Sequence, residues 1–287
     1  MKNLPPTLKP CPKGGNGVHV WLFYAACVLT EAGIEPEECA KIMEAGMTRP
    51  QNPGTEVTDA ISAARREDRG ETQTWPKRDL KRIHLILKQR AWPLKPTSTS
   101  AQDALEMLFP GNPLLCIGKT SQLFATRPRR SWAGHLDKSS LIVPSPMTAR
   151  TGKTKKGHMS EHSLDNTGPR HYLIIEFDWG TLDGQLKLHQ HLANICAPGF
   201  LVAIVHSGSK SAHGWYDFRG CEEHQTENFM DYAVSLGADP RLWLRSQFCR
   251  LPGGTREDGR PQPVLLFEKK FLQERADFLR KESIICR

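Results

Sequence analysis

The spacing of apolar residues changes near residue 92, and this change predicts two regions of different structure. Before it, apolar residues recur every three or four positions, which is the period of an amphipathic helix. Pro36 and Gly46 mark the start and the end of one such run. The predicted helices span residues 18–32, 36–46, a stretch after Thr55 that carries Val57, Ile61 and Ala64, and residues 79–90. We therefore expect a small all-α module over residues 1–92 and a Pro- and Ser-rich linker over residues 93–100.

Beyond the linker, short apolar runs are intermixed with helical stretches. The strand candidates are residues 114–117, 141–143, 171–179, 200–205, 212–218, 246–251 and 263–267. The helix candidates are residues 101–108, 183–195 and 223–236. Strands and helices in this order, with tight hairpin-like joins, predict an α+β domain with a largely antiparallel sheet over residues 101–287.

The net charge of the chain is concentrated in one segment. The 287 residues include 39 Lys and Arg and 31 Asp and Glu, which gives a net charge of +8. Residues 117–160 hold nine of the basic residues and one acid, Asp137, so the rest of the chain is balanced. Phe124 and Trp132 are interleaved with them, which suits a surface that binds phosphates and stacks bases. The candidate nucleic-acid-binding residues are Arg127, Arg129, Arg130, Lys153, Lys155 and Lys156. A solvated basic face without a ligand is the alternative.

Composition excludes several classes of protein. Seven Trp and eleven Phe exclude disorder as a description of the whole chain. No run approaches the ~20 apolar residues of a membrane span, and no cleavage site follows the apolar stretch 18–29. The eight cysteines are scattered, and Cys221 and His224 have no second ligand pair, so we expect neither a disulfide scaffold nor zinc. We expect a cytoplasmic protein without a membrane partner.

Two carboxylates end the strand candidate 171–179. Leu173, Ile175 and Phe177 alternate with the face that carries Glu176 and Asp178, so one face is apolar and belongs to a core. Two like charges this close repel unless a cation neutralises them. A pair of divalent ions does so and creates a phosphoryl- or nucleotidyl-transfer centre. Two acids on a sheet face open to water are the alternative.

A loop of small residues, 207–211, lies between two apolar strands and is a candidate phosphate cradle. Ser211, His213 and Trp215 share one face of the outgoing strand, and a His beside such a loop can donate to a phosphate oxygen. The candidate nucleotide-binding residues are Lys210, Ser211, His213, Arg250 and Arg256. A polar hairpin turn with a structural His is the alternative. Asp239, which follows the helix candidate 223–236, is a further acid whose alternative role is to cap the next turn.

These blocks, in this order, resemble the archaeo-eukaryotic primase superfamily. Glu176-Phe177-Asp178 matches a first motif of two acids separated by one residue. Ser211-Ala212-His213 matches a second motif Ser-x-His, and Asp239 matches a third acid. The segment that begins Arg250-Leu-Pro-Gly is similar to one that supplies a triphosphate-binding Arg. The first motif usually begins with Asp, whereas here it runs Glu then Asp. The helical front loosely resembles small helical domains of mobile-element replication proteins.

The resemblance implies an RRM-like antiparallel primase-polymerase core and a DNA primase or polymerase activity. Glu176, Asp178 and Asp239 would bind two Mg²⁺ or Mn²⁺ ions, and an NTP or dNTP would be the substrate. The implied partners are a single-stranded DNA or RNA template and a helicase encoded separately, in replication of a mobile element or phage or in repair.

Two other functions remain open. One is a primase-like domain that binds single-stranded nucleic acid or nucleotides without transferring them. The other is a rolling-circle-type nickase, for which His189-Gln190-His191 and Tyr232 would be the metal-binding and nucleophilic residues.

Overall fold

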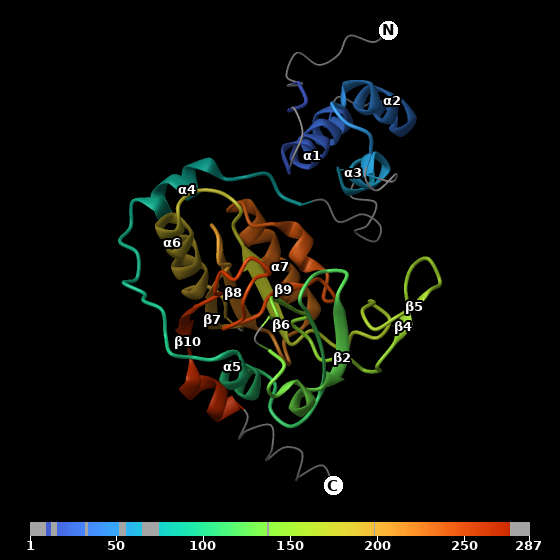
Figure 1. The fold of residues 1–287 in the computed structure, drawn as a ribbon. Helices are drawn as coiled ribbons and strands as arrows, with labels where there is room; N and C mark the ends of the chain where they lie inside the picture. Colours follow the sequence, from blue (N-terminus) through green and yellow to red (C-terminus); the bar gives the residue numbers. More distant parts are fainter. Residues whose placement is uncertain are drawn as a thin grey trace. The chain divides into compact units, whose positions relative to one another are not determined.

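The computed structural model describes residues 10–12, 16–31, 34–51, 56–64, 75–136, 138–197 and 199–275 (Figure 1). The chain divides into two compact units, Met1–Thr74 and Trp75–Arg287. Among the described residues, no helix combines the length and the apolar character that crossing a bilayer requires. The expected boundary at residue 92 differs from this division, because the helix near residue 80 packs into the core of the second unit.

The first unit is helical, as the apolar spacing predicts. Its helices are α1 (Asn16–Glu31), α2 (Pro36–Gly46) and α3 (Glu56–Ala64). Leu22, Met43 and Ile61, one from each helix, meet in a shared core. A Cβ at Gly46 would lie 2.9 Å from the ring of Trp21, so the glycine lets α2 end against α1. Thr55, which precedes α3 in the sequence, lies outside the described residues.

The second unit is built on a four-stranded antiparallel sheet, the central sheet, in the order β10-β7-β8-β6. Its strands are β6 (Tyr172–Glu176), β7 (Phe200–His206), β8 (Ala212–Asp217) and β10 (Val264–Phe267). β6 and β7 are joined through α6 and are separated by β8, which makes a split β-α-β arrangement. β6 therefore forms one edge of the sheet and β10 the other.

Helices cover one face of the central sheet. They are α4 (Leu80–Leu87), α6 (Leu182–Ala193) and α7 (Glu223–Ser235). Asp79 caps α4 by accepting from the backbone N–H of Arg82, and Thr181 caps α6 by accepting from that of Gly184. Leu173 and Ile175 of β6 pack against this helical layer, which confirms the predicted apolar face.

A second sheet covers the opposite face, together with α5 (Ala101–Leu108) and the helical residues 269–275 (Figure 1). This second sheet has the order β2-β1-β3-β9. Its strands are β1 (Leu114–Gly118), β2 (Phe124–Pro128), β3 (Leu141–Ile142) and β9 (Cys249–Arg250). Tyr172, Ile174 and Trp215 of the central sheet share a core with Leu115 and Ile117 of β1. The central sheet is therefore buried on both faces, and polar groups are accessible mainly at its ends.

The predicted strands and helices agree with the observed ones in their central residues more than in their first and last residues. β6 ends at Glu176, so Asp178 follows the strand instead of lying on it. β9 keeps two residues of the expected six. Three strands within the basic segment were not expected: β2 and the hairpin of β4 (Gly152–Lys153) and β5 (Met159–Ser160). The described fold is thus a mixed α+β unit with antiparallel sheets, preceded in sequence by a helical unit.

Candidate functional site

The end of β6 and the start of β8 bring the first two motifs into contact. Glu176 pairs with His213 in the antiparallel register. The hydroxyl of Ser211 donates to Oε1 of Glu176 at 2.6 Å, and Nε2 of His213 lies 3.1 Å from the same oxygen. Ser211 and His213 are buried, each with 3% of its surface exposed. The three side chains therefore form one cluster at the end of the central sheet.

A backbone hydrogen bond brings the third acid to this cluster. The N–H of Asp239 donates to the carbonyl of Glu176 at 2.9 Å. The carboxylate of Asp239 caps η2 (Pro240–Trp243), which is its expected structural role, and pairs with Arg241 at 3.0 Å. Asp178 is exposed, and Lys210 Nζ donates to its backbone carbonyl at 3.3 Å. We call Glu176, Asp178 and Asp239 with Ser211 and His213 the acidic site.

Glu176 and Asp178 have opposite pKa shifts. Burial alone would raise the pKa of Glu176, but the adjacent His213 and the hydrogen bond from Ser211 lower it to about 2. Asp178 remains exposed, but partial desolvation of its carboxyl group raises its pKa, and repulsion from Glu176 and Asp239 raises it further. A divalent cation would relieve this repulsion, and carboxylate oxygens are the ligands that Mg²⁺ and Mn²⁺ prefer. The donor chemistry therefore fits the expected ions. Within the described residues, no three His, Cys, Asp or Glu side chains are already gathered as a metal site.

His213 has unused hydrogen-bonding capacity in this buried position. Among the described residues, neither Nδ1 nor Nε2 has a partner with hydrogen-bond geometry, although Nε2 lies near Glu176. Buried polar atoms without partners are uncommon, because each one costs about 1–3 kcal/mol. The ring can therefore accept a further interaction from a bound ligand.

The expected arginines line a cavity next to the small-residue loop. Arg250 and Arg256 border a cavity of about 310 Å³, which is also lined by Lys119, Thr120, Ser140, Leu141, Glu257 and Asp258. Arg256 donates to the carbonyl of Ser207 at 3.1 Å, so it is fixed to the loop. Gly208 has a φ of +76°, and a Cβ there would lie 2.9 Å from Arg256 Cδ. Burial and the charge of Arg256 lower the pKa of Arg250. This Arg250 cavity therefore favours an anion.

The basic residues of the segment 117–160 differ in exposure more than the sequence predicts. Arg127, Arg130 and the lysines at 153, 155 and 156 are exposed. Arg129 is buried and donates to the carbonyl of Gly111 at 2.8 Å, so its guanidinium stabilises the chain instead of facing a ligand. Trp132 is also buried, and Arg127 stacks on its ring at 5.1 Å. Trp132 is therefore not available to stack on a base.

The residues considered for a nickase have separate contacts. His189 and His191 lie on α6 instead of on a strand. His189 is fully buried, with Nδ1 3.1 Å from the hydroxyl of Tyr216. His191 contacts the hydroxyl of Tyr232 at 2.7 Å. The two imidazoles thus do not form the paired metal ligands that this function requires.

Two residues near the acidic site were not expected. Arg241 is the counter-ion of Asp239, and Gln185 of α6 is buried and joins the loop to the end of β6. Its amide donates to the carbonyls of Trp179 and Lys210 and accepts from the N–H of Ala212. The signal for Gln185 is its position four residues before His189, since both are polar residues on the apolar face of a helix.

Comparison of the chain with protein-family models, with curated proteins and with solved structures gives no significant match.

Proposed function

We propose that the second unit is a metal-dependent nucleotidyltransferase of the primase-polymerase type. It adds a nucleotide from an NTP or dNTP to a 3′-hydroxyl on a single-stranded template. The observation that carries this proposal is the meeting of Glu176, Ser211 and His213 at one end of the central sheet, with Asp239 held against Glu176. These are the residues of three sequence motifs that lie far apart in the chain.

The three carboxylates would hold the ions. When bound by Glu176, Asp178 and Asp239, two Mg²⁺ or Mn²⁺ ions supply activation of a 3′-hydroxyl and neutralise the charge of the transferred phosphate. The pKa of Glu176, lowered to about 2, keeps that carboxylate ionised at neutral pH. Asp178 is exposed and follows the strand, beside the carboxylate of Glu176, so its side chain can reach a ligand from the solvent side.

The nucleotide is held by groups on both sides of the small-residue loop. Nε2 of His213 faces Glu176, so Nδ1, which has no partner among the described residues, is the ring nitrogen left to bond a phosphate oxygen. Arg250 and Arg256 neutralise the triphosphate from the adjacent cavity, where guanidiniums can bind oxygens in pairs. Lys210 lies at the rim, next to the backbone of Asp178. The exposed residues Arg127, Arg130, Lys153, Lys155 and Lys156 bind the template through its phosphates.

Incorporation of labelled nucleotides tests the proposal. The full chain is incubated with a single-stranded template, with and without a primer, and with Mg²⁺ or Mn²⁺. Asp178→Ala should reduce incorporation at least about 100-fold, because one of the proposed metal-binding carboxylates is removed. Binding of single-stranded DNA should stay unchanged.

Asp183→Ala is the matched control, since Asp183 is an exposed acid on α6 that pairs with Lys187 at 2.8 Å. It should retain full incorporation. Wild-type activity in the Asp178→Ala variant, or no metal-dependent incorporation by the wild type, would overturn the proposal.

A binding function without transfer is the second candidate, and one observation favours it. In the described structure, Glu176 is engaged by Ser211 and His213, and Asp239 is engaged by Arg241. Two of the three carboxylates therefore already have protein partners. If the wild-type protein binds nucleotides but incorporates none with either Mg²⁺ or Mn²⁺, the binding function is favoured over the transfer function.

A further inference from the structure

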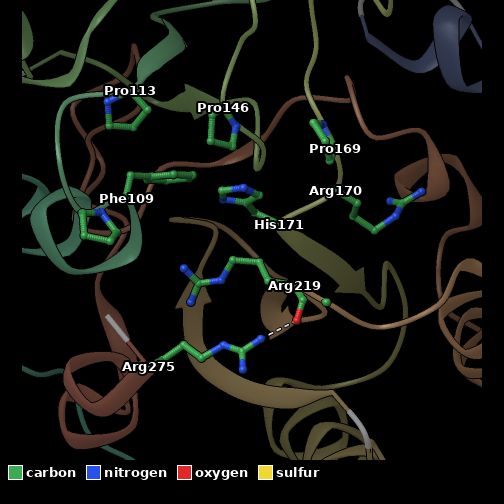
Figure 2. Close-up of a pocket in the computed structure, with 10 residues that line it drawn as sticks. Phe109, Pro113, Pro146, Pro169, Arg170, His171, Arg219 and Arg275 are labelled. Carbon is green, nitrogen blue, oxygen red and sulfur yellow. Dashed lines mark hydrogen bonds between the residues drawn. The ribbon is translucent and has the colours of Figure 1, made fainter. Parts of the chain in front are cut away.

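A second cavity, the arginine cavity, opens at the opposite end of β6 and β8 from the acidic site (Figure 2). Its volume is about 610 Å³, within the range of about 300–1,000 Å³ that small-molecule sites occupy. Arg170 and His171 directly precede β6, and Arg219 follows β8. The five residues of β6 separate this cavity from Glu176 by about 16 Å, so the two sites are distinct.

The cavity has a cationic side and an apolar side. In Figure 2, Arg219 and Arg275 lie on one side of the His171 ring, and Pro113, Pro146 and Pro169 lie on the other. Phe109 adds an aromatic ring to the apolar wall. A ligand that fills the cavity must therefore combine an anionic group with a flat, weakly polar body.

The positive charge of the cavity is only partly neutralised. Asp217 accepts from Arg219, with 2.9 Å between Nε and Oδ1. Glu223 lies 3.8 Å from Arg170, and its side chain is 65% exposed. Arg275 donates to the carbonyl of Arg219 and has no carboxylate partner among the described residues. Of the three lining guanidiniums, that of Arg275 is therefore the one whose charge no described carboxylate neutralises by direct contact.

Buried donors without partners line the same cavity. Among the described residues, Nε of Arg275 and Nδ1 of His171 are buried and make no hydrogen bond, whereas the guanidinium of Arg170 stacks on Trp243 at 4.2 Å. Burial and the charge of Arg219 lower the pKa of His171 to about 4, so its ring is neutral at pH 7. Unmade bonds at buried groups are costly, and two in one cavity indicate a ligand with acceptor oxygens.

We propose that the arginine cavity binds the phosphate monoester of a nucleotide, either free or at the 5′ end of a nucleic acid strand. Arg275, Arg219 and His171 hold the phosphate, because guanidiniums present paired N–H donors to its oxygens. The base and sugar pack against the accessible proline rings of the lining, since the cavity is much larger than a phosphate group. This inference does not depend on nucleotidyl transfer at the acidic site.

Calorimetric titration of the full chain in EDTA tests the proposal without loading a metal-dependent site. The probes are AMP, adenosine and inorganic phosphate, and an oligonucleotide with a 5′-phosphate compared with the same sequence ending in a 5′-hydroxyl. AMP or the 5′-phosphorylated strand should bind at least about tenfold more tightly than its unphosphorylated counterpart, because the phosphate supplies the charge-assisted bonds. The probe that binds identifies the source of the phosphate.

Variants locate the binding. Arg275→Ala should weaken the affinity for the probe that binds by about tenfold or more. Lys270 is an exposed cation on the same helical segment, and Lys270→Ala should leave the affinity unchanged. Pro169→Glu adds a negative charge at the exposed rim without removing a buried group and should also weaken binding, which keeps the test valid if Arg275→Ala unfolds. Asp178→Ala should leave this binding unchanged.

The proposal is overturned if neither phosphorylated probe binds, or if binding is unchanged in both Arg275→Ala and Pro169→Glu. Loss of incorporation in Asp178→Ala with binding retained supports both sites. If Arg275→Ala and Pro169→Glu lose the preference for phosphorylated probes and Asp178→Ala keeps it, the arginine cavity is supported even when the chain incorporates no nucleotide.

Discussion

Removal of the Ser211 hydroxyl should destabilise the second unit in a pH-dependent way. The hydroxyl donates at 2.6 Å to Glu176, a carboxylate that is 16% exposed, and Ser211 itself is 3% exposed. A hydrogen bond to a charged group contributes about 1.5–3 kcal/mol. We therefore expect Ser211→Ala to lower the free energy of unfolding by about 2 kcal/mol at pH 7.

The pH dependence follows from the lowered pKa of Glu176. The folded-state pKa of about 2 lies below the ordinary value of 4.5, so the ionised carboxylate stabilises the fold above pH 4.5. This stabilisation is lost as the pH falls through the folded-state pKa. Ser211→Ala raises the folded-state pKa but leaves the unfolded-state pKa unchanged. The difference in unfolding free energy between variant and wild type should therefore have its largest value above pH 4.5 and should shrink as the pH falls towards about 2.

Urea denaturation followed by tryptophan fluorescence measures this difference, because six of the seven tryptophans lie in the second unit. Ser209→Ala, an exposed serine of the same loop, is the control and should change the unfolding free energy little. An equal loss at pH 7 and pH 3.5, or no loss at pH 7, would refute the reasoning.

Two further predictions concern packing and the choice of function. Gly214→Ala should lower the free energy of unfolding by about 1–3 kcal/mol, because its Cβ would lie 2.6 Å from Nδ1 of the buried His189. Gly184→Ala is the control, since its Cβ would face the flexible side chain of Leu87, and the same urea titration should show little change. Tyr232→Phe should leave nucleotide incorporation unchanged, because Tyr232 contacts His191 on the helical layer; loss of a covalent DNA adduct in this variant would instead favour a nickase.

The sequence was most informative where local pattern and strand pairing agree. Alternation along residues 171–177 correctly predicts that the face of Leu173, Ile175 and Phe177 is core, and Tyr172 and Ile174 on the other face are buried as well. The shared face of Ser211, His213 and Trp215 is the one that meets Glu176. These relations follow from a period of two, which tertiary contacts do not change.

Other features depend on residues distant in the chain. Arg129 resembles its exposed neighbours in sequence but is buried by the carbonyl of Gly111, 18 residues away. β2 was missed because its Phe-Ala-Thr-Arg-Pro sequence has little apolar alternation, and it is defined by pairing with β1. Asp178 was placed on the strand, whereas the pairing of β6 with β8 ends at Glu176. In each case the deciding contact lies outside the local window.

The hydrogen bond from Asp239 to Glu176 also covers part of an edge of the central sheet. β6 is an edge strand, and an edge offers unpaired backbone groups on which a strand of another molecule can add. The N–H of Asp239 occupies the carbonyl of Glu176 on this edge, and η2 packs beside the strand. A loop deletion that removes Asp239 would therefore do more than remove an acid. It would expose a template for intermolecular sheet growth, so such a variant should aggregate before its lost chemistry could be measured.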